Sequence, residues 1–219
     1  MSSNVLAPFT AFAVLLLVLE WLRRGLGVTA DVTRKLFHLG VGLWALATVS
    51  LFEDGVHAAM PFLVLAGIMY LSFRFEIFEA VEDDGASLGS VLLPLSCAML
   101  LLWFWGDRVY VAIAGIFAAS FGDTTAALVG RRMGTRKYRT LGQERSMEGT
   151  LSLFLASGLT MAPVLAILGG LGSHQAIAFA LIGATVAASV ETVSVYGTDN
   201  LTVPIATAAT LATLIRFSQ

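Results

Sequence analysis

The chain has 219 residues, of which 57% are hydrophobic and 13% are charged, and its mean hydropathy is +0.83. Soluble domains carry about 25% charged residues, so this composition predicts an integral membrane protein. We expect one membrane-embedded domain over residues 1–219. The net charge of −2 gives no indication of nucleic-acid binding. The single cysteine, Cys97, lies in an apolar run, which excludes an intrachain disulfide and a cysteine-based metal cluster.

Eight apolar segments approach the length of about 20 residues that a helix needs to cross a bilayer. They lie at 5–22, 36–52, 57–73, 87–105, 109–129, 149–169, 175–195 and 200–217. We expect the first to be a retained helix, because no basic residue precedes it and no small-residue cleavage site follows. A seven-helix arrangement would merge or omit one segment. The prediction is an all-α, multi-pass membrane bundle of seven or eight helices.

The positions of the basic residues predict the orientation of this bundle. If the N-terminus is outside, the connections on the cytoplasmic side contain all of the 13 Lys and Arg residues except Arg108 and Arg216. Such an excess marks the cytoplasmic side of membrane proteins. In a prokaryote the protein would lie in the cytoplasmic membrane.

Residues 73–84, "FRFEIFEAVEDD", connect the third and fourth segments on that side. Phe73, Ile77, Phe78 and Val81 would share one face of a helix, which suggests a short helix at the membrane surface. A solvated acidic loop is the alternative, and the sequence does not separate the two.

The most polar stretch of the chain covers residues 121–150 and begins with Asp123 near the end of a membrane segment. An ionisable residue in that place usually faces a cavity or a partner. We expect a loop over 130–145, with turns at Gly130, Gly134 and Gly142. Its basic residues suit phosphate oxygens, although contact with anionic lipid headgroups is an alternative. They are Arg131, Arg132, Arg136, Lys137, Arg139 and Arg145.

Four carboxylates are expected on the same cytoplasmic face: Asp123, Glu148, Glu191 and Asp199. Magnesium binds carboxylate and phosphate oxygens together, so this set predicts a metal-polyphosphate centre. Helix capping would also explain Glu148, with Ser146 or Thr150 as the cap, and "TDN" at 198–200 could be a turn. No P-loop sequence occurs in the chain.

A third polar cluster, "RKLFHLGVG", begins the second segment. Lys35 and His38 are three residues apart and therefore share a helix face. His38 could orient a phosphate or move a proton, although an interfacial histidine beside basic neighbours is the alternative.

The motifs "RKLFHLGVG", "GDTTAALVGRRMG", "RSMEGT" and "ETVSVYGTDNLTVP" resemble, in this order, those of the polyprenol kinase family. That family includes dolichol kinases, phytol kinases and CTP-dependent diacylglycerol kinases. The resemblance implies phosphoryl transfer from a nucleoside triphosphate, typically CTP, to the hydroxyl of a membrane lipid alcohol. One departure is Arg145, which stands where the family often has lysine.

The expected roles combine the residues and the resemblance. Magnesium would be held by Asp123, Glu148, Glu191 and Asp199, and the proton acceptor would be Asp123, Asp199 or His38. The phosphates would be bound by Lys35, Arg131, Arg132, Arg136, Lys137, Arg145, Ser146 and Asn200. A CDP-lipid synthase is the close alternative. A transporter is disfavoured because the polar residues gather at one surface and no repeat is present. A homo-oligomer is compatible with this chain.

Overall fold

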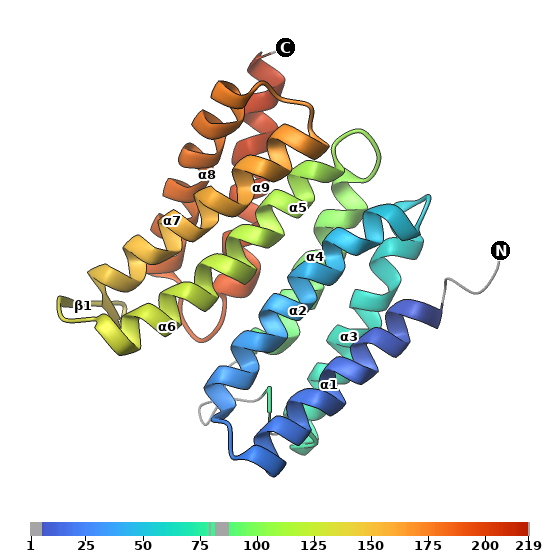
Figure 1. Ribbon diagram of the computed structural model, residues 1–219, viewed down its shortest axis with the longest axis vertical. Helices are drawn as coiled ribbons and strands as arrows, with labels where there is room; N and C mark the ends of the chain where they lie inside the picture. The colour runs from blue at the N-terminus through green and yellow to red at the C-terminus, as the bar shows by residue number, and fades with distance from the viewer. Residues whose placement is uncertain (1–5, 79, 82–87, 219) are drawn as a thin grey trace.

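The computed structural model describes residues 6–78, 80–81 and 88–218, and within them the chain forms a helical bundle with one small hairpin (Figure 1). The α-helices are α1 (Leu6–Leu26), α2 (Ala30–Leu51), α3 (Gly55–Phe75), α4 (Gly89–Phe104), α5 (Val109–Phe117), α6 (Thr124–Met133), α7 (Met147–Pro163), α8 (Ser173–Val193) and α9 (Asp199–Ser218). The π-helical segments are η1 (Ala118–Asp123) and η2 (Val164–Leu168), and the strands are β1 (Lys137–Thr140) and β2 (Gln143–Ser146).

Two of the long helices are composite. The segments α5, η1 and α6 form one continuous helix over 109–133, and α7 continues into η2 to residue 168. The described residues therefore contain eight long helical spans, which confirms the all-α, multi-pass prediction in its eight-helix form. Five are long and apolar enough to cross a membrane: Gly55–Phe75, Val109–Met133, Met147–Leu168, Ser173–Val193 and Asp199–Ser218. The external position of the N-terminus stays a prediction.

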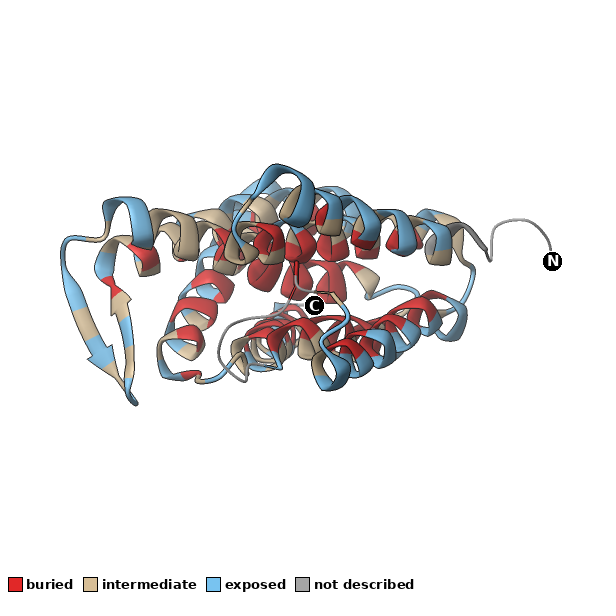
Figure 2. Cartoon of the chain, turned by 90° about the horizontal axis from the view of Figure 1, so that it is seen from below, coloured by how far each residue is buried: buried red, intermediate tan, exposed pale blue. Residues whose placement is uncertain are grey.

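The core lies where these helices pack against one another. Buried residues face the middle of the bundle and exposed residues cover its outside (Figure 2). Phe37, Ile113 and Leu153 are fully buried, whereas Leu159 and Ile167 are exposed. In a bilayer, exposed apolar side chains of this kind contact lipid and carry no cost. The expected membrane environment therefore explains an outer surface that would be unfavourable in water.

A close approach of α6 and α7 positions the polar stretch. A Cβ atom added to Gly149 would lie 3.0 Å from the Ala126 carbonyl oxygen and 3.4 Å from the Gly130 Cα. Only glycine lets the two backbones come this near. The predicted turn at Gly130 is therefore wrong, because Gly130 lies inside α6 and serves this helix contact.

The predicted loop over 130–145 is largely ordered secondary structure. After α6 the chain forms an antiparallel hairpin in which Lys137 pairs with Ser146 and Thr140 with Gln143. Leu141 and Gly142 form its two-residue turn with φ of 48° and 82°. Positive φ at both positions is the geometry of a type I′ turn, so the expectation of a turn at Gly142 is confirmed.

The connection after α3 does not form the surface helix proposed for residues 73–84. Helix α3 ends at Phe75, and Ile77, Phe78 and Val81 are not helical. Residues 74–77 are exposed, whereas Val81 is buried and the Ala80 amide donates to Glu20 Oε2 at 3.1 Å. Residues 79 and 82–84 lie outside the described residues.

Candidate functional site

The polar clusters of the sequence meet at one end of the bundle. The start of α2, the end of α6, the hairpin, the start of α7 and the α8–α9 connection all lie at this end (Figure 1). The π-helical segment η1 contacts α2, α7, α8 and α9 there. Asp123 is its last residue, so the packing of the bundle places this carboxylate between elements that are distant in sequence. Short π-helical segments occur often at functional sites.

Asp123 is held by two residues of α2. Lys35 Nζ forms an ion pair with Asp123 Oδ2, and His38 Nδ1 lies 3.2 Å from the same oxygen. Lys35 and His38 are both buried, and the Thr124 hydroxyl donates to the Lys35 carbonyl at 3.4 Å. These contacts fix α2 against η1 across 88 residues of sequence. The predicted pairing of Lys35 and His38 on one helix face places both beside Asp123.

The start of α9 contributes Asp199 and Asn200. Asn200 is buried, and its Nδ2 donates to the Gly197 carbonyl at 3.2 Å. Asp199 lies close enough to interact electrostatically with Asp123, Lys35 and Arg145. The structure therefore brings the predicted pair Asp123 and Asp199 into one site.

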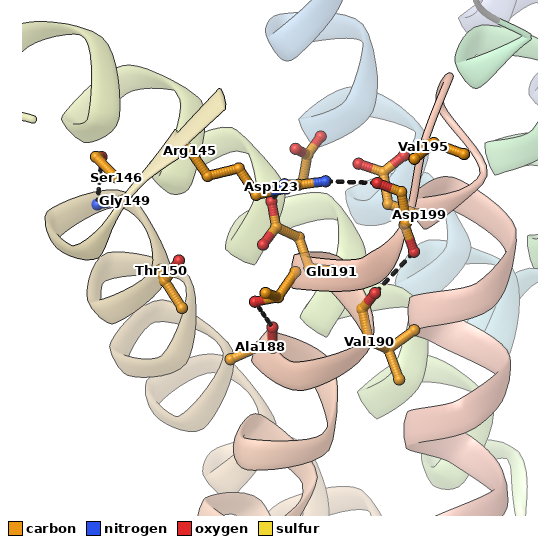
Figure 3. A network of polar contacts seen from close by, with 12 residues as sticks. Asp123, Arg145, Ser146, Gly149, Thr150, Ala188, Val190, Glu191, Val195 and Asp199 are labelled. Carbon is orange, nitrogen blue, oxygen red and sulfur yellow. Dashed lines mark hydrogen bonds and ion pairs between the residues drawn. The ribbon is translucent and has the colours of Figure 1, made fainter. Parts of the chain in front are cut away.

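Arg145 connects the hairpin to the end of α8. Its guanidinium forms an ion pair with Glu191, and its Nη2 donates to the Ser194 carbonyl at 2.8 Å. In Figure 3 its side chain extends from the hairpin strand toward Glu191, in the region that also contains Asp123. The planar guanidinium of arginine can hold two acceptors at once in a fixed geometry, whereas the lysine ammonium is a compact charge on a flexible stem. Arginine at this position therefore suits a linking role.

Two cavities open at this end and share one wall. The first has a volume of about 410 Å³ and the second about 450 Å³. Arg34, Lys35, Asp123, Glu144 and Arg145 line both cavities. The Lys35–Asp123 ion pair thus stands where the two spaces meet.

The first cavity lies between α2, α6, α7 and the hairpin. The residues that line it and not the second include the small Ala126, Ala127, Gly130, Gly134 and Gly149, and the polar Asp31, Arg131, Lys137, Ser146, Thr150 and Glu191. Small residues keep one side of this space open, and the rest of its lining contains cationic side chains with carboxylates beside them. Anionic ligands of nucleotide size are suited to such a space.

The second cavity lies between α2, the start of α4 and the α8–α9 connection. Its own lining residues are His38, Gly89, Gln143, Ser194, Val195, Tyr196, Gly197, Asp199 and Asn200. Beyond the shared wall, this lining contains polar side chains and no Lys or Arg.

Several predicted site residues lie away from the two cavities. Arg132 and Arg136 are exposed and are not among the residues that line them. Glu148 accepts hydrogen bonds from the Thr135 hydroxyl at 2.6 Å and from the Arg136 amide at 3.2 Å. Its carboxylate therefore ties the start of the hairpin to α7. Ser146 accepts from the Gly149 amide at 3.1 Å and is the N-cap that the sequence suggested.

Two acidic residues of the site were not predicted. Asp31 in the first turn of α2 forms an ion pair with Arg131 on α6. Glu144 lies 2.6 Å from Lys137 across the hairpin, which lowers the pKa of Glu144 and raises the pKa of Lys137. The sequence offered one signal for Asp31, its position four residues before Lys35 on the same helix face.

The four carboxylates predicted to bind magnesium do not all meet at one point. Among the described residues, no group of three or more His, Cys, Asp or Glu side chains is placed to hold a metal ion. Asp123 and Asp199 are near each other, whereas Glu191 is paired with Arg145 and Glu148 with the hairpin. Magnesium is commonly bound through one or two carboxylates together with substrate phosphates, and this pair fits that pattern.

Comparison with known proteins reveals kinases of lipid alcohols. The chain is 36% identical to a phytol kinase from Synechocystis over 205 residues, which cover 91% of this chain and 86% of the relative. It is 23% identical to CTP-dependent diacylglycerol kinase 1 of Eremothecium gossypii over 218 residues, covering 86% and 68% of the two chains. It is 32% identical to human dolichol kinase over 126 residues, which are 55% of this chain and 22% of that protein. No family model and no solved structure matches the chain.

Proposed function

The chain belongs to the polyprenol kinase family, and on that premise we propose that it transfers the terminal phosphoryl group of CTP to the hydroxyl of an isoprenoid alcohol such as phytol. It is an integral, multi-pass membrane protein and a phosphotransferase that acts on a lipid alcohol. The resemblance to a phytol kinase over most of both chains supports the isoprenoid acceptor. The CTP-dependent relative supports the donor.

One observation carries this proposal: the wall that the two cavities share. There the Lys35–Asp123 pair and Arg145 stand between a space that has further cations in its lining and a space whose own lining has no Lys or Arg. Phosphoryl transfer needs a donor and an acceptor placed on either side of one phosphorus atom, with its charge neutralised. A shared wall of charged groups meets that requirement.

In this proposal the first cavity binds the triphosphate. Arg131, Lys137 and Arg145 supply donors to its oxygens, and Lys35 lies at the end nearest Asp123. Arg131 is held by Asp31 and Lys137 by Glu144. When phosphate binds, Arg131 and Lys137 would leave these carboxylates and pair with the ligand, which has the greater negative charge.

The transfer itself makes and breaks one bond to phosphorus. The alcohol oxygen bonds to the γ-phosphorus, the bond from that phosphorus to the β–γ bridging oxygen breaks, and CDP leaves with the electron pair. The hydroxyl proton passes to a carboxylate of the Asp123 and Asp199 pair. Asp123 and Asp199 would hold Mg²⁺, which would supply positive charge to the phosphates.

The cytidylyltransferase alternative is not favoured, because the relatives described above are all kinases. The two reactions also leave different products. A kinase releases CDP, whereas a CDP-lipid synthase consumes a phosphorylated lipid and releases pyrophosphate.

The test is an assay of the purified protein in lipid nanodiscs. CTP, ATP, UTP and GTP are each offered with phytol, farnesol, a long polyprenol and diacylglycerol, and both the lipid product and the released nucleotide are identified. We expect phosphorylated phytol and CDP in equal amounts, with CTP preferred. Absence of any phosphorylated alcohol, or release of pyrophosphate, would refute the proposal.

A further inference from the structure

We propose that the second cavity is the acceptor subsite, which receives the hydroxyl end of the lipid alcohol while the first cavity holds the polyphosphate. This inference rests on the proposed kinase function. It assigns His38, Asp199 and Asn200 to the alcohol, and so removes Asn200 from the predicted phosphate-binding residues.

The charges of the two linings differ in a way that separates the ligands. Outside the shared wall, the first cavity has Arg131 and Lys137 together with two ion-paired carboxylates, Asp31 and Glu191. The second has neither Lys nor Arg there and includes the carboxylate of Asp199. A polyphosphate is stabilised by the first lining and repelled by an additional carboxylate in the second. A neutral alcohol has no such preference for cations and can occupy the second.

Two buried polar atoms of the residues that line the second cavity lack a hydrogen-bond donor within the described part of the chain. Asn200 Nδ2 donates to the Gly197 carbonyl, so Oδ1 is the atom that is free to accept, and it has no partner among the described residues. Neither ring nitrogen of His38 has a hydrogen-bond partner by geometry among the described residues, and its Nδ1 lies 3.2 Å from Asp123 Oδ2. With the ring proton on Nδ1, Nε2 is an acceptor.

An unpartnered buried acceptor is costly and is usually satisfied by a ligand or water. An ionised phosphate has oxygens that only accept, so it cannot satisfy either atom. An alcohol hydroxyl donates one hydrogen bond and therefore fits.

The rim of the second cavity is suited to a lipid chain. Tyr196 lines this cavity and is exposed, and Leu88, next to the lining residue Gly89, is exposed as well. Tyrosine is favoured at the membrane interface because its ring is apolar and its hydroxyl is polar. The first cavity instead has the ion pairs of Asp31 with Arg131 and of Lys137 with Glu144 near its lining. An alcohol with its tail in the bilayer would thus enter beside Tyr196.

This placement makes Asp199 the carboxylate on the acceptor side. Asp199 lines only the second cavity, whereas Asp123 lines both and already has Lys35 and His38 as partners. As the alcohol oxygen bonds to the γ-phosphorus, its proton passes to Asp199, and CDP leaves with the electrons of the broken bridging bond.

A crossed set of variants tests the assignment. We make Asn200→Leu and Asp199→Asn in the second cavity, Arg131→Gln and Lys137→Gln in the first, and Thr213→Ala as a control on an exposed face of α9. For each we measure the dissociation constant of CTP by titration without alcohol, and the KM and kcat for phytol at saturating CTP.

We expect Asn200→Leu to raise the phytol KM about tenfold, the loss of one buried hydrogen bond, with CTP affinity within a factor of two. Asp199→Asn should lower kcat for phytol phosphorylation. The first-cavity variants should weaken CTP about tenfold and leave the phytol KM unchanged, and Thr213→Ala should match wild type.

The inference is overturned if Asn200→Leu weakens CTP binding as much as Arg131→Gln does, or if it leaves the phytol KM unchanged. Retained CTP binding shows that a variant is folded, so a misfolded protein is not mistaken for support. A wild-type protein that phosphorylates no alcohol would refute the proposed function instead, which keeps the two failures distinct.

Discussion

The ion pair between Arg145 and Glu191 can be tested by breaking it from one side. Its side chains are 17% and 6% exposed, and it joins the hairpin to the end of α8. In Arg145→Met the Glu191 carboxylate is left buried without its cation, and removing one partner of a buried pair costs about 3–5 kcal/mol. Arg145 also lines both cavities, where water can enter, so we expect the lower value, about 3 kcal/mol.

A loss of about 3 kcal/mol corresponds to a fall in Tm of about 6–12 °C for a domain of this size. The assay is thermal unfolding of the purified protein, followed by tryptophan fluorescence. The matched control is the double variant Arg145→Met/Glu191→Met, which removes both charges. Because two apolar side chains need no partner, we expect it to recover most of the lost Tm.

The same pair of variants separates stability from binding. The double variant should be stable and still bind CTP at least tenfold more weakly, because Arg145 is lost as a phosphate donor. If Arg145→Met and the double variant have the same Tm, the pair does not stabilise the fold and the reasoning fails. Wild-type CTP affinity in the double variant would remove Arg145 from the phosphate site.

Three further results are expected. Asp123→Asn should reduce phytol phosphorylation by about a thousandfold or more while CTP still binds, because a proposed magnesium ligand and proton acceptor is lost. Turnover above a tenth of wild type would contradict this. Gly134→Val should lower the free energy of unfolding by about 1–3 kcal/mol, because its Cβ would lie 2.8 Å from Ser146 Cβ. The control is Gly67→Ala in α3, which has open space around it and should be neutral or stabilising. Lys137, across the hairpin, lowers the pKa of Glu144. The ion pair therefore stabilises the folded state above pH 4.5, the ordinary pKa, and this stabilisation is lost as the pH falls further. The Tm difference between wild type and Glu144→Gln should be small and should vanish in acid.

The membrane architecture could be predicted from the sequence because it depends on local composition. Each span is a run of apolar residues that must satisfy its own backbone hydrogen bonds in lipid, and a helix does this without help from the rest of the chain. The prediction of seven or eight helices, and of an N-cap at Ser146 or Thr150, followed from such local patterns, and the structure has eight helices with the cap at Ser146. The polar motifs likewise identified Lys35 and Asp123 before any contact between them was known.

The hairpin was missed for a physical reason. A two-stranded sheet has a weak local signal, and its strands are only four residues each. The hairpin is ordered by contacts with other elements, such as the hydrogen bond from the Arg136 amide to Glu148 and the ion pair of Arg145 with Glu191. Gly130 was misread for the same reason, because its role depends on the approach of α7.

The sequence by itself determined that this is a multi-pass membrane protein with its charge collected near one surface, and it predicted candidate site residues there. Only the tertiary structure decided which carboxylate has which partner. Asp123 meets Lys35 across 88 residues, and Arg145 meets the Ser194 carbonyl across 49. Coulombic and hydrogen-bond interactions depend on distance in space, which sequence spacing does not give between separate helices. The division of one polar surface into two cavities with different charges therefore arises from helix packing.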